Sequence, residues 1–298
     1  MLAILLGLCS CGSGSDAPET VSNESDAADE VLDEGSEDLT DVESETTEDA
    51  SGVTDEEKVE LVVFAAASMT ETMNEIAGIY MEKNPNVEVT YTFDSSGTLK
   101  TQIEENADCD IFISAAQKQM NELDITADAE INVDGLDFVD DTTRFDLVSN
   151  SVVLIVPEGN PAGIASFDDL TSDKIELMSI GNADVPVGQY SEEILTYLGF
   201  WDDLNDNSKI TFGTNVKDVL SQVAEGVVDC GIVYSTDAAT VDNVEIVASA
   251  PEGSHKPITY PAAILKGSQN PDAAKDFLDF LKTDECVKIF EDAGFLIP

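Results

Sequence analysis

Positively charged residues are scarce in this chain of 298 residues, which has 13 Lys and Arg against 62 Asp and Glu and a formal net charge of −49. Binding to the phosphate backbone of nucleic acids depends mainly on Lys and Arg. The charge balance therefore excludes a nucleic-acid partner and predicts repulsion from anionic membrane surfaces. It does not exclude a small anionic ligand, because donor groups in a cleft outweigh a global field that salt screens.

Cysteines and long hydrophobic runs are also few. Of the five cysteines, Cys9 and Cys11 lie in an apolar leader. The other three, Cys109, Cys230 and Cys286, lack Cys-x-x-Cys or Cys/His spacing, which predicts neither a disulfide framework nor a zinc site. Cys109 and Cys230 lie in apolar runs, which favours small buried side chains. The only strongly apolar run is the first eight residues or so, whereas a transmembrane helix needs about 20.

Catalytic signatures are missing as well. The single histidine, His255, lies between Ser254 and Lys256 in a run that is typical of a turn. None of the motifs GxSxG, GxxxxGK[ST], HExxH and GxGxxG occurs near a suitable strand. A hydrolase needs a nucleophile, a base and an orienting acid, so we expect that the protein is not an enzyme. A hydrolytic enzyme and a surface protein that only interacts or adheres are the alternatives outside the class of binding proteins.

The N-terminus, residues 1–14, resembles a bacterial lipoprotein signal. Its apolar stretch ends in Leu8-Cys9-Ser10-Cys11. In such signals a small residue precedes the lipidated cysteine, so Cys11 after Ser10 is the predicted lipidation site, and Cys9 after Leu8 is the second choice. No Lys or Arg precedes the apolar run, although signal peptides normally carry a positive charge there. A true start codon farther upstream explains this departure.

Residues 15–57 form an acidic segment with 18 acidic side chains, no basic ones and almost no aromatics. Such a segment buries too little apolar area to offset the entropy of ordering, and its like charges extend it. We therefore expect a disordered linker between the anchored Cys11 and a folded body. A calcium-binding tail is the alternative.

From residue 58 onward, short apolar runs alternate with helical patterns. Leu61–Ala65 is such a run, and Met69, Met73 and Ile76 follow it at helical spacing. Repeated units of this kind predict an α/β protein with largely parallel sheets. Because about 240 residues is large for one sheet, we expect two α/β lobes with a ligand cleft between them. The expected boundaries are 58–149 for the first part of lobe 1, 150–250 for lobe 2 and 251–298 for the return to lobe 1.

Small or hydroxylic residues recur where an expected strand gives way to a helix. Each helix start offers unpaired backbone N–H groups and the positive end of the helix dipole. Several that meet in one cleft form an anion site without any charged side chain. Taken singly, each motif is also typical of an ordinary N-cap. The four places are Ala65–Met69, Phe93–Thr98, Val185–Gly188 and Phe212–Val216.

A series of short motifs occurs in order along residues 58–298. They are Val63–Thr70, Phe93–Leu99, Asp110–Ala115, Val185–Gly188, Gly231–Asp237, Ser254-His255, Tyr260-Pro261 and Ile289–Phe295. Together they resemble the periplasmic molybdate-binding proteins of ABC importers, which also bind tungstate. The leader and the acidic segment lie outside this resemblance.

The resemblance implies a bilobal type II periplasmic-binding-protein fold, with two chain crossings and an oxyanion held between the lobes. Ser68 and Ser96 match residues that donate from both the hydroxyl and the backbone N–H. Val187 and Val216 match backbone donors. Tyr234 matches a phenol that donates from the second lobe. The resemblance thus implies binding of the molybdate anion through these donors, with no direct metal ligand and no cofactor.

The resemblance also implies a lipid-anchored, extracytoplasmic, monomeric protein that delivers its anion to a membrane permease. A site of donors alone suits a fully deprotonated tetrahedral dianion, whereas protonated phosphate requires an acceptor. Asp94 and Asp184 lie near the motifs, and we expect them to face solvent or cap turns. Gly97 replaces a hydroxylic residue of some relatives, which predicts altered support around the same donors. Sulfate and phosphate stay open as alternative ligands, because the choice of molybdate over sulfate depends on cavity size.

Overall fold

A computed structural model describes residues 58–298, so Cys9, Cys11 and the predicted acidic linker lie outside the described residues. The described chain contains two five-stranded sheets, ordered β2-β1-β3-β10-β4 and β7-β6-β8-β5-β9. The first sheet consists of β1 (Val59–Ala66), β2 (Val87–Asp94), β3 (Ile111–Ile113), β4 (Phe145–Asn150) and β10 (Ile258–Ile264). The second consists of β5 (Val152–Pro157), β6 (Met178–Gly181), β7 (Ile210–Gly213), β8 (Cys230–Tyr234) and β9 (Val244–Ser249).

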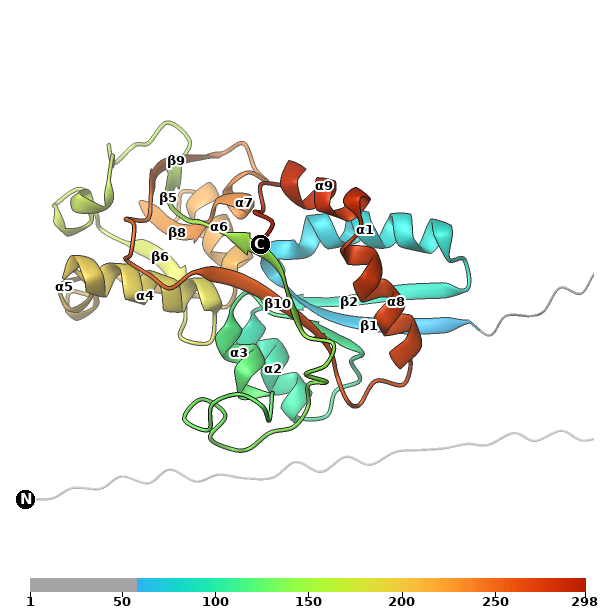
Figure 1. The fold of residues 1–298 in the computed structure, drawn as a ribbon. Coiled ribbons are helices and arrows are strands. Elements are labelled where there is room, and N and C mark those ends of the chain that lie inside the picture. Colours follow the sequence, from blue (N-terminus) through green and yellow to red (C-terminus); the bar gives the residue numbers. More distant parts are fainter. Residues whose placement is uncertain (1–57) are drawn as a thin grey trace, which may run out of the picture. The chain divides into compact units, whose positions relative to one another are not determined.

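Each sheet together with its helices is called a lobe below, with the β1 sheet in lobe 1 and the β6 sheet in lobe 2 (Figure 1). The boundaries predicted near residues 150 and 250 stay a prediction. Lobe 1 contains η1 (Ala67–Met69), α1 (Thr70–Lys83), α2 (Ser96–Glu104), α3 (Gln117–Glu122), α8 (Pro271–Leu281) and α9 (Asp284–Asp292). Lobe 2 contains η2 (Phe167–Thr171), α4 (Pro186–Leu198), α5 (Trp201–Asp206), α6 (Val216–Ala224) and α7 (Ser235–Ala238). Among these helices, none is both long and apolar enough to cross a bilayer.

The expectation of largely parallel sheets is wrong, because both sheets are mixed. In lobe 1, β1 runs parallel to β2 and β3, while β10 runs antiparallel to β3 and β4. Lobe 2 repeats this arrangement, with β6 parallel to β7 and β8, and β5 antiparallel to β8 and β9. Parallel neighbours need a crossover helix, but the chain passes directly from β4 to β5 and returns without a helix from β9 to β10. Strands β4 and β10 therefore pair antiparallel in the first sheet, and β5 and β9 pair antiparallel in the second.

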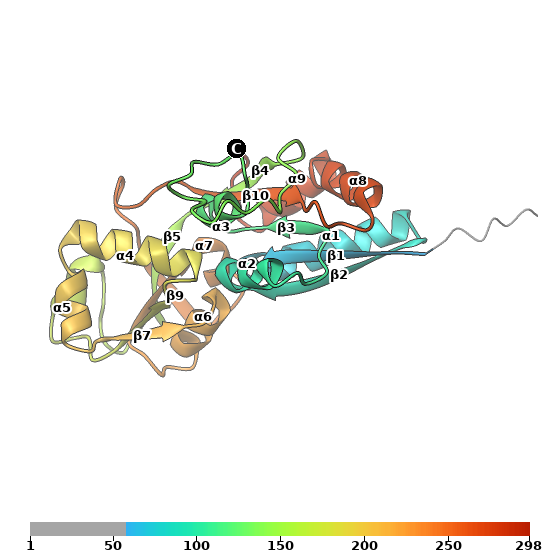
Figure 2. The same cartoon turned by 90° about the horizontal axis from the view of Figure 1, so that it is seen from below.

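Strand β1 shows why lobe 1 carries helices on both faces of its sheet. Successive side chains of a strand point to opposite faces. Leu61, Val63 and Ala65 belong to the hydrophobic core that continues into lobe 2, whereas Phe64 belongs to a separate core. Helices α1 and α8 cover the first face, and α2 and α3 cover the second (Figures 1 and 2). The carboxyl end of β1, where η1 begins, is thereby packed between helices on both faces of the sheet.

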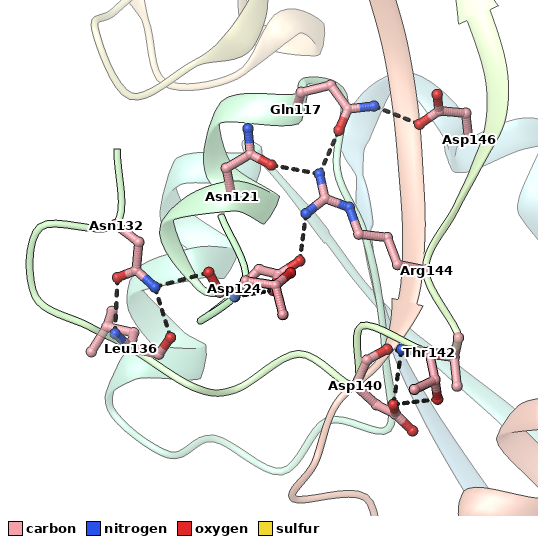
Figure 3. A network of polar contacts seen from close by, with 11 residues as sticks. Gln117, Asn121, Asp124, Asn132, Leu136, Asp140, Thr142, Arg144 and Asp146 are labelled. Carbon is pink, nitrogen blue, oxygen red and sulfur yellow. Dashed lines mark hydrogen bonds and ion pairs between the residues drawn. The ribbon is translucent and has the colours of Figure 1, made fainter. Parts of the chain in front are cut away.

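The only arginine of the chain, Arg144, lies in a polar network at the edge of lobe 1 (Figure 3). Its guanidinium donates to Asp124 Oδ2 at 2.7 Å, to Gln117 Oε1 at 2.5 Å and to Asn121 Oδ1 at 2.6 Å. Although burial raises the pKa of Asp124, hydrogen bonds from Thr126 and Arg144 bring it below its ordinary value. Arg144 thus connects α3 to the start of β4, and its role is structural.

Replacing Arg144 with methionine should lower the free energy of unfolding by about 1.5–3 kcal/mol, because it removes hydrogen bonds to a buried carboxylate. Urea unfolding of the purified protein measures this loss. Lys275→Met is the control, since it removes only an exposed ion pair with Asp279 and should leave the free energy of unfolding close to that of wild type. A loss for Arg144→Met no larger than the control would contradict the structural role of the network.

Candidate oxyanion-binding site

The five predicted donor residues lie together around one small pocket between the lobes. The pocket is tight, with a cavity volume of about 10 Å³. The structure therefore brings together all five, although their role in ligand binding stays a prediction. The five are Ser68, Ser96, Val187, Val216 and Tyr234. The other lining residues are Ala66, Ala67, Asp94, Ser95, Ala115, Val185 and Pro186.

Two helix starts supply the lobe 1 side of the pocket. Ser68 is the middle residue of the 3₁₀ helix η1, which follows β1 directly. Ser96 is the first residue of α2, where the hydroxyl of the N-cap residue Ser95 accepts from the N–H of Thr98 at 3.1 Å. Because the cap satisfies the Thr98 N–H, the earlier N–H groups of the first turn are left for another partner.

Two further helix starts supply the lobe 2 side. Helix α4 begins with Pro186, which has no N–H, so its first backbone donor is that of Val187. Helix α6 begins with Val216 and is capped by Asn215, whose Oδ1 accepts from the N–H of Asp218 at 3.0 Å. First-turn N–H groups have no partner within their own helix. Both valines line the pocket, and each has a main-chain N–H without a partner in its own helix, whatever its side chain.

Tyr234 ends β8, and its hydroxyl has no hydrogen-bond partner among residues 58–298. Its residue is 1% exposed, and no described residue hydrogen-bonds its buried Oη. Burial raises the pKa of Tyr234 well above its ordinary value, so the phenol keeps its proton. An unsatisfied buried hydroxyl costs about 1–3 kcal/mol, and an oxyanion in the pocket would remove that cost by accepting from it.

The pocket lining, as far as the structure describes it, contains no Lys, Arg or His. Asp94 is the one carboxylate of this lining, and the structure bears out the second part of the expectation that it faces solvent or caps a turn. It does act within a turn, because its Oδ1 accepts from the N–H of Ser95 at 2.7 Å. Asp184 is exposed, as expected, and contributes its backbone carbonyl to a contact between the lobes. The site can attract an anion only through neutral donors and helix dipoles.

Contacts between the lobes surround the pocket. The N–H of Gly97 donates to the carbonyl oxygen of Asp184 at 3.1 Å. The side-chain amide of Asn215 lies 3.4 Å from Asp94 Oδ1. An alanine Cβ at position 97 would lie 2.2 Å from the Asp184 oxygen, so the missing side chain of Gly97 permits this approach. The lobes are thus closed over the pocket.

Lys217, next to Val216, also bridges the lobes. Its Nζ lies 2.8 Å from Glu71 Oε2 of lobe 1 and 3.2 Å from Asp237 Oδ1 of its own lobe. Asp237 is fully buried, and neither of its oxygens has a well-directed hydrogen bond from residues 58–298. Burial raises the pKa of Asp237 to about 6, in spite of the opposing effect of Lys217.

Asp237→Asn should stabilise the protein at pH 8. The folded-state pKa of Asp237 lies above its ordinary value, so the folded state binds more protons than the unfolded state between about pH 4 and 6, and stability falls as the pH rises through that window. Asparagine does not ionise, so this loss does not occur in the variant. Its free energy of unfolding should be roughly 1–3 kcal/mol higher than that of wild type at pH 8, and the difference should disappear toward pH 4. Thermal unfolding across this pH range measures it, with Asp279→Asn at an exposed site as control. A lower stability of Asp237→Asn at pH 8 would contradict the assignment.

Sequence reasoning missed two residues behind the pocket, Tyr260 and Asn150. The Tyr260 hydroxyl lies 3.0 Å from Ser68 Oγ and 3.2 Å from Asn150 Nδ2. Tyr260 was noted only as part of a motif, and Asn150 had no local signal. His255, which the sequence set apart as a turn residue, contacts the carbonyl of Lys256 through Nδ1 at 2.7 Å and does not line the pocket.

Residues 61–296 match the family model described as bacterial extracellular solute-binding protein. The chain belongs to this family. The solute-binding protein is 40% identical to the molybdate-binding protein ModA of Haemophilus influenzae over 242 residues, which cover 79% of this chain and 89% of the relative. It is 36% identical to ModA of Escherichia coli K12 over 252 residues, with 83% and 92% covered.

A solved structure supports the same relationship. The periplasmic molybdate-binding protein of Azotobacter vinelandii is 25% identical, with a TM-score of 0.68 over 80% of this chain and 99% of that one. The predicted bilobal fold of the solute-binding protein and its resemblance to molybdate-binding proteins are thereby confirmed. The family is one of solute-binding proteins rather than of enzymes.

Proposed function

We propose that this solute-binding protein captures molybdate, and also tungstate, outside the cytoplasm and delivers it to the permease of an ABC importer. The observation that carries the proposal is the buried hydroxyl of Tyr234, which has no partner among residues 58–298, in a pocket lined by neutral donors and by a single carboxylate, that of Asp94. Relatives that are named molybdate-binding proteins support the choice of anion.

The donors suffice to hold a dianion in a protein of strongly negative charge. The proposed set comprises two serine hydroxyls, four backbone N–H groups and one phenol, at residues 68, 96, 187, 216 and 234. Hydrogen bonds to a charged group contribute about 1.5–3 kcal/mol each. Part of this free energy closes the lobes, so the sum is not an affinity. A fully deprotonated tetrahedral oxyanion offers four acceptor oxygens and no proton, which matches this set of donors.

Thermal unfolding of the full chain tests this proposal against a protein that only adheres to surfaces. A ligand that binds only the folded state raises its stability in proportion to the logarithm of its concentration over Kd. We expect molybdate and tungstate to raise the melting temperature, and sulfate and phosphate to raise it less at equal concentration. The absence of a shift with every oxyanion would contradict the proposal.

We further propose that the protein is a monomer anchored to the membrane through a lipid on Cys11, with the acidic segment 15–57 as a linker. The support is the small residue Ser10 before Cys11 and the apolar run before it. Cys11→Ser should move the protein expressed in bacteria from the membrane fraction to the soluble fraction, whereas Cys9→Ser should not. The reverse result would assign the lipid to Cys9.

A further inference from the structure

An ion pair joins the two lobes directly beside two of the proposed donor residues. Lys217 Nζ of α6 lies 2.8 Å from Glu71 Oε2 of α1. Lys217 follows Val216, which lines the pocket from lobe 2, and Glu71 comes three residues after Ser68, which lines it from lobe 1. Helix α6 also packs on η1, the helix that contains Ser68. The ion pair thus lies where closure brings donors of the two lobes together.

A second carboxylate holds the lysine on its own lobe. Lys217 Nζ lies 3.2 Å from Oδ1 of Asp237, which is fully buried in α7. Because α6 and α7 pack together within lobe 2, this contact does not depend on closure of the lobes. Asp237 is ionised at pH 8, since burial raises its pKa only to about 6. The ammonium group is therefore in place at the boundary before Glu71 of lobe 1 reaches it.

This positioning by Asp237 lets the ion pair with Glu71 contribute to closure. An exposed ion pair is usually weak, because two long side chains lose conformational freedom when they meet. The side chain of Lys217 is only 25% exposed, whereas that of Glu71 is 55% exposed. The contact with Asp237 already orders the lysine, so contact with Glu71 costs less entropy than it does for two free side chains.

We propose that Glu71 and Lys217 are positioning residues that form a latch between the lobes and hold them closed over the bound anion. This rests on the proposed function of the pocket, although neither side chain lines it. The latch predicts a result of opposite sign to simple charge repulsion. Loss of a negative charge from the protein should strengthen binding of a dianion through the overall field, whereas loss of the Glu71 charge should weaken it.

Three variants isolate the latch. Glu71→Gln removes its negative charge and leaves the buried contact between Lys217 and Asp237 intact. Glu75→Gln is the matched control, because Glu75 is exposed one turn further along α1 and its loss makes the same change in net charge. The third variant combines Lys217→Met with Asp237→Asn, so that no buried carboxylate is left without its cation.

Calorimetric titration of the full chain with molybdate at pH 8 measures the affinity of wild type and of each variant. Glu71→Gln should bind molybdate roughly two- to fivefold more weakly than Glu75→Gln. When Glu71→Gln is added to Lys217→Met/Asp237→Asn, it should weaken binding no further, because the partner of Glu71 is already gone. Melting temperatures without ligand show that each variant is folded.

The outcomes separate the latch from the proposed function. If wild type binds molybdate and Glu71→Gln binds it as tightly as Glu75→Gln or more tightly, the latch is overturned, because charge repulsion alone then describes Glu71. An equal loss on adding Glu71→Gln with and without Lys217 overturns it too, since Glu71 then acts through another contact. If wild type does not bind molybdate at all, the proposed function fails instead.

Discussion

Molybdate should bind at least about a hundredfold more weakly to Gly97→Ala than to wild type, a loss of roughly 3 kcal/mol. The added Cβ would lie 2.2 Å from the carbonyl oxygen of Asp184 and 2.8 Å from its Cβ. A backbone oxygen cannot yield as the end of a flexible side chain can, so the lobes must stay apart. The donors of Val187 and Val216 then fail to reach an anion held by lobe 1. Isothermal titration measures the loss.

The ligand-free stability of Gly97→Ala distinguishes a closure defect from a folding defect. Open lobes relieve the clash, and alanine is a better helix residue than glycine within α2. We therefore expect no decrease in the melting temperature without ligand. Gly78→Ala is the matched control, because nothing lies within 4 Å of a Cβ at that position in α1. Wild-type affinity in Gly97→Ala would show that ligand is bound without this contact.

The double variant Ser68→Ala/Ser96→Ala should lose roughly 3–6 kcal/mol of binding free energy, with about half from each serine. Each substitution removes one hydroxyl donor to the anion. Ser96→Ala also leaves the buried N–H of Ala115 without its acceptor, so a lower melting temperature is expected for that variant. Calorimetric titration of both single variants and the double variant measures the effects.

The matched control for the serines is Ser179→Ala. Ser179 is a fully buried serine of β6 outside the pocket, and its hydroxyl has no partner among residues 58–298. Its loss should leave molybdate affinity unchanged. Affinities of the Ser68 and Ser96 single variants equal to that of Ser179→Ala would remove both serines from the site.

Much of the site could be predicted because its donors follow a local rule. Ser68, Ser96, Val187 and Val216 each lie at or near a helix start, a position that turn residues and the change of hydrophobic period reveal. Motif resemblance added Tyr234, which no periodicity indicates. The pattern could also place the two α/β lobes, because it alternates over the whole length of the folded chain.

Other features depend on contacts that local patterns do not contain. Gly97 meets Asp184 across the lobes, and Tyr260 meets Ser68 192 residues away. Short elements were missed for a related reason. Helix α5 has Leu204 as its only buried residue. A single buried position does not produce a helical period in the sequence, so this helix was not predicted. Strand β4 was missed as well. It includes the exposed Asp146, whose carboxylate accepts a hydrogen bond from Gln117 in the network of Arg144, a contact that the local pattern does not contain.

The direct test of the central claim, that neutral donors around one pocket bind a bare tetrahedral dianion, is calorimetric titration of the full chain with molybdate, tungstate, sulfate and phosphate. We predict one molybdate or tungstate per chain, bound at least tenfold more tightly than sulfate or phosphate, a difference of about 1.4 kcal/mol or more. No heat with molybdate and tungstate, or tighter binding of phosphate, would contradict the account.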